Sequence, residues 1–362
     1  MIYDLIVIGG GAAGLVVGNL AKTKGFKFLI LEMNKAARKI RVTGNGKCNL
    51  TNLDMRPEYY NDDFVKDVIY SYPPQKVISF FERMGVKTKT VENRVYPYNE
   101  SALTVASFLI KGVQENLIEG YKVESIKKLE DIFVINDEYK AKNVFFATGT
   151  DATMGHDSVS LLKAFGHRLV PFKPSLVWLK TEVGYIKGLN GIRAKAALSL
   201  FDKDKKIAVE RGEVLFKKEG VSGIAAFMLS AYVARKDGDY SLSIDFAEDM
   251  TATLLSKYPL EGVVKKEISH NIFKQARDRK ISPEQAVKDF RLKIIGLGER
   301  KFAQVLSGGI DLGDMDPKTM CSKLVKGLYI LGECMNIDGQ CGGYNLHWAF
   351  ASAMAAMESI SK

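Results

Sequence analysis

The glycine-rich run Gly9-Gly10-Gly11-Ala12-Ala13-Gly14 constrains the possible folds of this chain more than any other feature. A continuous apolar run, residues 4–8, precedes it, as expected for a buried parallel strand, and residues 15–24 have the pattern of a helix. A second buried strand is predicted over residues 26–31 and ends at Glu32. The glycines therefore lie at the first turn of a strand–helix–strand unit, which predicts a Rossmann-like α/β domain.

The glycine positions are those of a turn that binds a dinucleotide. Gly9 permits the tight turn, Gly11 allows the backbone to approach a pyrophosphate, and Gly14 lets the helix pack closely on the strand. The helix N-terminus offers free backbone amides and the positive end of its dipole to the phosphates. Glu32 follows 18 residues after Gly14 and can accept hydrogen bonds from ribose hydroxyls. Its charge would repel the 2′-phosphate of NADP at this site.

Three further segments favour FAD over NAD as the dinucleotide. Residues 43–52, TGNGKCNLTN, follow a basic stretch and offer backbone amides and small side chains beside a flat ring. Residues 142–149, KNVFFATG, indicate a strand that returns to the nucleotide sheet after a helix and a β-meander, in which Val123 would begin the strand that passes the adenine. The strand 327–333, GLYILGE, leads through a glycine-rich loop to a long helix over 344–359, whose N-terminus suits the negative charge of a reduced flavin.

The predicted architecture is a Rossmann-like FAD-binding domain of the two-dinucleotide-binding-domain type, interrupted by a substrate domain. The FAD-binding domain is expected to comprise residues 1–150 and 305–362, and the inserted domain residues 151–304. The insert is expected to be mostly antiparallel β over about 165–246, with a small helical part over about 247–300. The helices expected there cover residues 250–255, 263–277 and 283–292.

Two of the longer motifs together are similar to those of a known family. TGNGKCNLTN (43–52) and GECMNIDGQCGGYNLHWAFASAMAA (332–356) resemble the BaiN/RdsA-type flavoproteins, which are also described as NAD(P)/FAD-dependent oxidoreductases or aminoacetone-oxidase-type FAD-binding enzymes. The resemblance covers nearly the whole chain. Lys47, Thr150 and Ile224 stand where the family pattern has an arginine, a second glycine and a proline. These departures leave the substrate open.

The resemblance implies that FAD is held non-covalently by the two ends of the chain. The contacts it implies are Gly9, Gly11, Ala13, Gly14, Glu32, Lys39, Thr43, Gly44, Gly46, Cys48, Asn49, Val123, Ala147, Thr148, Gly149, Gly332, Glu333, Asp338, Gly343, Asn345 and Leu346.

Composition narrows the cellular setting and the partners. The net charge is +10, but the lysines and arginines are interleaved with acids, which disfavours a dedicated nucleic-acid surface. The cysteines form no CxxC pair, so neither a metal site nor a dithiol centre is expected. No apolar run is long enough to cross a membrane. A cytoplasmic protein with a small-molecule substrate is therefore expected, and its oligomeric state is left open.

The chemistry expected from this sequence is hydride transfer through flavin N5. Two half-reactions stay open: oxidation of an amine such as aminoacetone by oxygen, and reduction of an enone-like acceptor by NAD(P)H bound transiently. The residues expected on the substrate side are His347, Tyr344 and Asn49. The alternatives are an RNA-associated flavoprotein of the tRNA-modifying type and a flavin-binding regulator without turnover.

Overall fold

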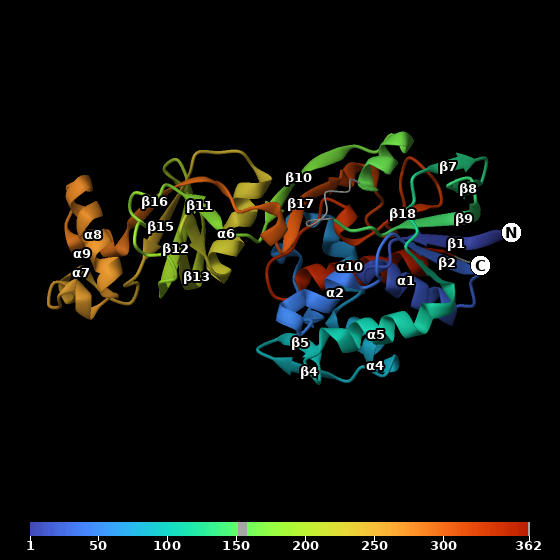
Figure 1. Ribbon diagram of the computed structural model, residues 1–362, viewed down its shortest axis with the longest axis horizontal. Coiled ribbons are helices and arrows are strands. Elements are labelled where there is room, and N and C mark those ends of the chain that lie inside the picture. The colour runs from blue at the N-terminus through green and yellow to red at the C-terminus, as the bar shows by residue number, and fades with distance from the viewer. Residues whose placement is uncertain (151–157, 361–362) are drawn as a thin grey trace. The chain divides into compact units, whose positions relative to one another are not determined.

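The computed structural model describes residues 1–150 and 158–360, and the chain forms two compact units (Figure 1). The first unit comprises Met1–Phe172 and Gly308–Lys362, and the second comprises Lys173–Ser307. The predicted fold class is confirmed, because one unit is a Rossmann-type α/β structure and the other is an antiparallel barrel. The functional limits expected for the two domains stay a prediction. None of the described helices is both long and apolar enough to cross a membrane.

The first unit is built on a seven-stranded sheet with a parallel centre. Its strands are β1 Ile2–Ile8, β2 Phe28–Glu32, β6 Leu117–Glu119, β7 Ile126–Leu129, β8 Ile132–Ile135, β9 Tyr139–Phe146 and β18 Leu328–Ile330. β1 lies between β2 and β9, and the outer parallel strands β6 and β18 pair with β2 and β9. β7 and β8 form the expected antiparallel meander beside β9. The second half of β1 is fully apolar and buried, as a central parallel strand requires.

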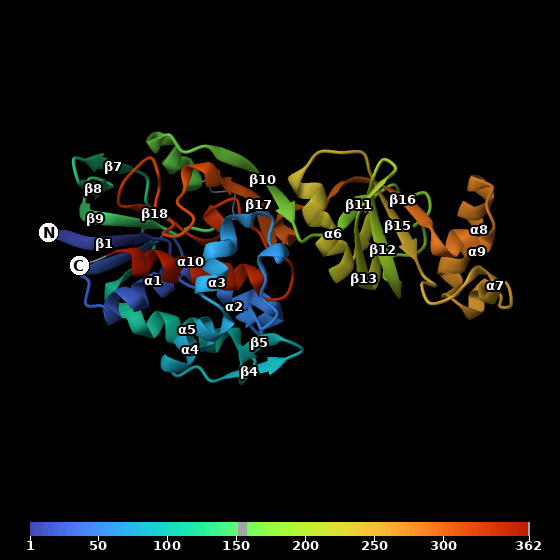
Figure 2. The same ribbon diagram turned by 180° about the vertical axis from the view of Figure 1, so that it is seen from behind.

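Helices cover this sheet and complete the core. They are α1 Ala12–Thr23, α2 Arg38–Val42, α3 Lys66–Ser71, α4 Pro74–Arg83, α5 Ala102–Val113 and α10 Tyr344–Ser359. α1 packs against both α5 and α10, so the two ends of the chain share one core (Figure 2). α10 is apolar on nearly all its faces because α1, α3 and α4 surround it. A small antiparallel sheet of β3 Thr51–Asn52, β5 Arg94–Pro97 and β4 Thr88–Val91 lies beside its N-terminal half.

The second unit is a closed six-stranded antiparallel barrel. In barrel order the strands are β11 Leu179–Thr181, β14 Gly220–Ser222, β13 Lys205–Lys217, β12 Arg193–Asp202, β15 Tyr240–Asp245 and β16 Phe290–Leu297. Alternate residues, such as Leu198 and Leu200 on β12 or Leu242 and Ile244 on β15, are fully buried and fill the interior. β10 Leu169–Ser175 and β17 Val305–Ile310 form a separate two-stranded sheet.

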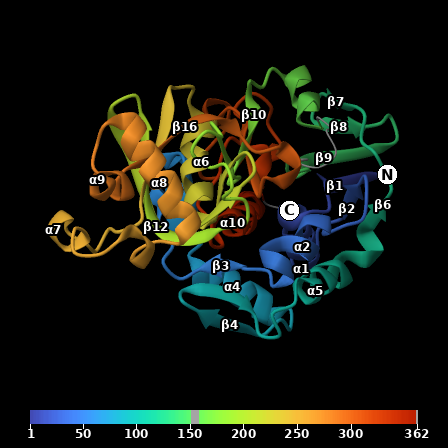
Figure 3. The ribbon, with the colours of Figure 1, turned by 60° about the vertical axis from the view of Figure 1, so that its left-hand side comes forward.

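The helices of the second unit share the core of its barrel. They are α6 Ile224–Arg235, α7 Ala252–Leu255, α8 Lys266–Arg279 and α9 Pro283–Lys288. Figure 3 shows α8 and α9 beside the barrel, and Ile268, Ile272 and Val287 belong to its hydrophobic cluster. α9 begins with a capping box between Ser282 and Gln285.

Three details of the predicted secondary structure are wrong. The helix expected over 283–292 ends at Lys288, and β16 begins at Phe290, because the apolar residues from there alternate with a period of two. The last barrel strand therefore lies inside the part expected to be helical. Val123 does not begin a strand: β6 ends at Glu119 and β7 begins at Ile126. β14 was too short to show a pattern and was not predicted.

Candidate active site

The carboxyl ends of three parallel strands, β1, β9 and β18, meet at one edge of the sheet (Figure 1). Ile8 is the register partner of Phe146, and Phe146 is the partner of Ile330, so the three strands end level with one another. Each strand leads into one of the segments predicted to contact FAD. Because ligands of open α/β sheets bind outside this edge, the fold places these segments at a binding site.

The three fingerprint glycines differ in whether the packing of the protein leaves room for a side chain. Gly9 has a φ of +108°, and a Cβ there would lie 2.5 Å from the carbonyl oxygen of Ala147. A Cβ at Gly14 would overlap the carbonyl oxygen of Gly9. Gly11 has a φ of −86°, and a Cβ there would meet nothing nearer than the Ala147 oxygen at 3.9 Å. Packing explains the first two glycines, whereas Gly11 borders open space at the N-terminus of α1.

Glu32 ends β2 at the same edge of the sheet. Its Oε2 accepts a hydrogen bond from the backbone N–H of Gly10 at 2.6 Å, and its Oε1 accepts one from Asn34 at 2.8 Å. The carboxylate is thus fixed beside the glycine turn. The backbone N–H of Tyr121 donates to the carbonyl oxygen of Glu32 at 2.9 Å, and the half-buried Val123 follows two residues later in a loop.

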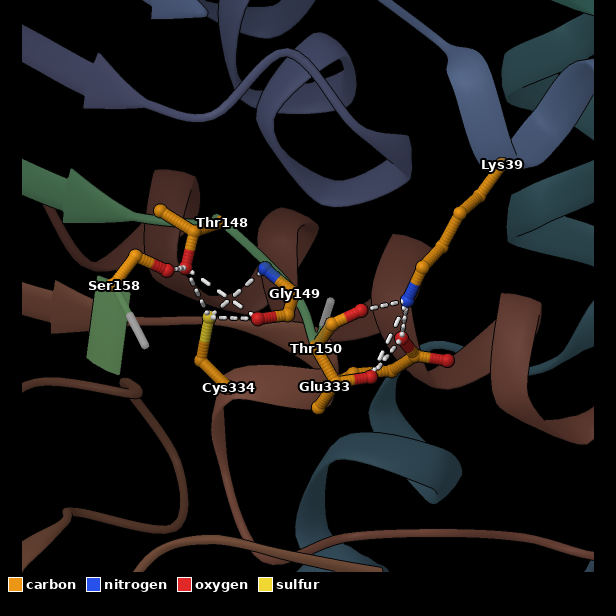
Figure 4. Close-up of polar contacts among 7 residues, drawn as sticks. All are labelled: Lys39, Thr148, Gly149, Thr150, Ser158, Glu333 and Cys334. Atoms are coloured by element: carbon orange, nitrogen blue, oxygen red, sulfur yellow. Dashed lines mark hydrogen bonds and ion pairs between the residues drawn. The ribbon is translucent and has the colours of Figure 1, made fainter. Parts of the chain in front are cut away.

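Two predicted contacts from opposite ends of the chain touch each other (Figure 4). Lys39 Nζ, from α2, lies 2.9 Å from Glu333 Oε2, in the turn after β18. Lys39 also donates to the carbonyl oxygen of Thr150, whose hydroxyl donates to Glu333 at 3.1 Å. The pair is partly exposed, so its charges remain within reach of a ligand.

Cys334 joins the turns that follow β9 and β18, and the sequence did not single it out. Its Sγ accepts a hydrogen bond from the backbone N–H of Gly149 at 3.1 Å and lies 3.4 Å from Thr148 Oγ1 (Figure 4). Ser158 donates to that same hydroxyl at 2.9 Å. Burial raises the pKa of the Cys334 thiol to about 11, so it is a neutral structural group at neutral pH.

Side chains of α10 bond both backbone polar groups of Gly332, its N–H and its carbonyl. Gly332 has a φ of +58°, its N–H donates to Ser352 Oγ at 3.1 Å, and its carbonyl accepts from Trp348 Nε1 at 3.2 Å. Both side chains are fully buried. The sequence did not predict this role for Trp348 and Ser352, although their spacing of four residues places them on one face of the helix.

The loop over residues 43–52 takes an unusual backbone path to reach α10. Gly44 has a φ of +57° and Cys48 a φ of +58°, both in the left-handed region. Burial raises the pKa of the Cys48 thiol to about 12. Asn49 Oδ1 is buried without a hydrogen-bond partner among the described residues. A Cβ at Gly343, the N-cap of α10, would lie 2.9 Å from this atom. A buried acceptor at a helix N-terminus suits a ligand that brings its own N–H donor.

The two predicted substrate-side residues on α10 are both buried. His347 is fully buried, and its Nδ1 lies 2.7 Å from Thr51 Oγ1. Burial lowers its pKa to about 4, which keeps the imidazole neutral at neutral pH. Tyr344 donates to the carbonyl oxygen of Asp54 at 3.2 Å, and burial raises its pKa to about 12. This geometry suits positioning groups, and their roles toward a substrate stay a prediction.

The remaining predicted contacts lie in the first turns of α1 and α10, in the loop over residues 43–52, or in the loop before α10. That loop is closed by Asn345, whose side chain accepts from the N–H of Gly339 at 2.8 Å and donates to its carbonyl at 2.9 Å. Lys47, which stands at the family's arginine position and is not one of the predicted contacts, lies 2.7 Å from Glu100. The others are Ala13, Thr43, Gly46, Asp338 and Leu346.

The residues present fit an extended dinucleotide. The N-terminus of α1, bordered by the open space at Gly11, offers amides to a diphosphate. Glu32 lies where a ribose acceptor is expected, at the end of the second strand. The unpartnered Asn49 Oδ1 and the N-terminus of α10 offer an acceptor and a positive dipole end to a flavin ring.

The fold and this site define the protein as a Rossmann-type, FAD-dependent oxidoreductase. The same fold occurs in the 3-ketosteroid delta1-dehydrogenase of Sterolibacterium denitrificans, with a TM-score of 0.55, 12% sequence identity, and coverage of 99% of this chain and 100% of that one. The chain belongs to the family described as HI0933-like protein Rossmann domain, whose model matches residues 3–359. The resemblance to BaiN/RdsA-type flavoproteins is thereby confirmed.

Characterised relatives match this chain over almost its whole length. The 3-dehydro-bile acid delta(4,6)-reductase of Clostridium scindens is 29% identical over 396 residues, which cover 97% of each chain. The ribosomal RNA dihydrouridine synthase of Escherichia coli is 25% identical over 395 residues, which cover 99% of this chain and 98% of that one.

Proposed function

We propose that the protein is a reductase that uses FAD, held non-covalently, to saturate a carbon–carbon double bond conjugated to a carbonyl group. The choice of this reaction rests on the reactions stated in the names of two relatives. A 3-dehydro-delta(4,6) bile acid holds such a bond in an unsaturated ketone, and a uridine holds one in its uracil ring. The two substrates share little else, so the conjugated carbonyl is the feature that a related site would keep.

The overall reaction balances with NAD(P)H as the electron donor. NAD(P)H, a proton and the conjugated carbonyl compound give NAD(P)⁺ and the saturated carbonyl compound. Bound FAD supplies the hydride chemistry, because its N5 position accepts and delivers a hydride. FAD would occupy the fingerprint turn, and the sequence has no second GxGxxG that follows a predicted strand, so NAD(P)H would bind transiently.

The chain would contribute position and electrostatics rather than a reactive side chain. The N-terminus of α10 favours negative charge, which suits the reduced state of the ring. Trp348 and Ser352 hold the Gly332 turn, and the Thr51–His347 pair fixes β3 to α10. Tyr344, with its pKa raised to about 12, stays protonated at neutral pH, and its hydroxyl holds the Asp54 carbonyl beside the start of α10.

Anaerobic stopped-flow spectroscopy tests this proposal. The flavin of the holoprotein should bleach on mixing with NADH or NADPH, and it should recolour on a second mixing with 2-cyclohexen-1-one, with cyclohexanone as the product. Recolouring by oxygen but not by any conjugated carbonyl compound, after bleaching by aminoacetone, would establish an amine oxidase instead. A flavin that none of these donors bleaches would refute the reductase and support a regulator.

A further inference from the structure

Folding gathers a basic and aromatic surface at one end of the barrel from segments far apart in the sequence. It is formed by Lys180 of β11, Lys217 at the end of β13, and the 3₁₀ turn Arg300–Phe302. Lys217 and Lys301 lie 5.8 and 5.0 Å from the ring centre of Phe302. We call these residues the Phe302 surface.

A buried tryptophan beneath this surface holds the lysines together. Trp178 is 7% exposed, and Lys180 and Lys217 lie 5.5 and 5.2 Å from its ring centre. A Cβ at Gly298 would press on the Trp178 ring, so the tryptophan is tightly enclosed on that side. Both ammonium groups therefore lie over a tightly enclosed ring, and Lys217 is within cation–π range of Phe302 as well as of Trp178.

The charges of these segments do not cancel. Lys180 and Lys217 have no ion-pair partner among the described residues, whereas Lys301 pairs with Glu299 at 2.8 Å. The Phe302 surface itself holds four cations, Lys180, Lys217, Arg300 and Lys301, and the acid that pairs with one of them is Glu299. A net positive charge thus surrounds a phenylalanine that is 55% exposed.

We propose that the Phe302 surface binds single-stranded nucleic acid, with a base stacked on Phe302 and neighbouring phosphates held by the lysines and Arg300. Stacking on an exposed ring within a positively charged surface is how proteins hold single strands without reading their sequence. The surface departs from the expectation of no nucleic-acid partner, which rested on the interleaving of charges along the sequence. It also deepens the proposed function, since RNA carries uracil, a conjugated carbonyl substrate.

Binding to a 5′-fluorescein-labelled 15-nucleotide oligouridine, followed by anisotropy with nuclease-treated holoprotein, tests this inference. Four phosphate contacts on a single strand predict a slope near 3 for log Kd against log salt, or roughly a 50-fold weakening from 50 to 200 mM salt. Phe302→Ala should weaken binding roughly 5- to 150-fold, as the loss of one stacked base does. Lys217→Gln should lower the slope by about 0.7, so that the same salt change weakens binding only roughly 20-fold.

Matched variants control for charge, aromatic content and folding. Lys205→Gln removes the same charge from the opposite end of β13, about 40 Å away by strand length, and should leave the slope unchanged. Phe273→Ala removes another exposed phenylalanine, on α8, and should leave Kd unchanged. Thermal melts of all four variants should match the wild type.

Three results would overturn the inference. One is no detectable binding at 50 mM salt, and another is binding that Lys205→Gln weakens as much as Lys217→Gln does. Stronger association with phosphatidylserine vesicles than with the oligonucleotide, lost in Phe302→Ala, would assign the surface to a membrane and also refute it. Reduction of 2-cyclohexen-1-one should be unchanged in Phe302→Ala, so failure of RNA binding and failure of the proposed reductase are separate results.

Discussion

Replacing Gly11 with alanine should leave the stability of the apoprotein nearly unchanged but weaken the binding of FAD. The added methyl group would have no atom nearer than 3.9 Å, and the backbone, at φ −86° and ψ −162°, is in a region open to alanine. Alanine is a poorer N-cap than glycine by roughly 0.5 kcal/mol, but it restricts the unfolded chain by a similar amount. The free energy of unfolding of the apoprotein should therefore change by less than about 1 kcal/mol.

The affinity for FAD should fall much further. The methyl group would occupy the open space at the N-terminus of α1 and push a diphosphate away from the backbone amides. Losing one hydrogen bond to a charged group is worth about 1.5–3 kcal/mol, or roughly a 10- to 150-fold rise in Kd. Gly14→Ala is the contrasting variant: its methyl group would overlap the Gly9 carbonyl oxygen, so it should destabilise the apoprotein itself by about 1–3 kcal/mol.

Urea unfolding of the apoproteins and calorimetric titration with FAD measure the two quantities independently. If Gly11→Ala binds FAD as tightly as the wild type, the cofactor does not require a glycine at this position. If that variant loses as much apoprotein stability as Gly14→Ala, packing explains both glycines and the distinction between them is lost.

Three further predictions concern groups around the same site. Burial lowers the pKa of His347 to about 4 from an ordinary 6.5, so the unfolded chain binds this proton more readily than the folded protein does. The free energy of unfolding should therefore fall by about 3 kcal/mol as the pH drops from 6.5 to 4. Urea melts over this pH range should show that fall for the wild type and a flatter profile for His347→Gln. Glu32→Gln places an amide where two backbone N–H groups now donate, and calorimetry should show weaker FAD binding, by roughly 10-fold or more, together with a lower apoprotein Tm. Trp348→Phe removes the donor to the Gly332 carbonyl and should cost about 1–3 kcal/mol in urea unfolding, whereas no change would show that the turn is held without it.

Much of the nucleotide-binding unit could be predicted because each local signal agreed with the next. The signals lie on consecutive elements, namely the apolar run on β1, the glycine turn before α1 and the acid at the end of β2. Elements that pack together here are therefore also close in sequence. The bounds of α10 also followed from the sequence, because two glycines precede an uninterrupted apolar helix.

The parts that could not be predicted depend on contacts between segments that are far apart in the sequence. β16 follows a strong helix start, and its strand pattern covers only a few residues before Gly296 interrupts it. The contacts of Cys334 join turns whose proximity arises only when β9 and β18 pair, and those of Trp348 and Ser352 arise only when α10 packs against the turn after β18. The Phe302 surface likewise draws its cations from segments that the barrel alone brings together.

If the two ends of the chain build one FAD site, hydrogen–deuterium exchange of the apoprotein with and without FAD should show it. Added FAD should slow exchange together in residues 9–14, in the loop 43–49 and in the first turn of α10, and should leave the barrel strands β12 and β13 unchanged. Protection confined to the N-terminal turn, with the start of α10 exchanging as before, would contradict the account.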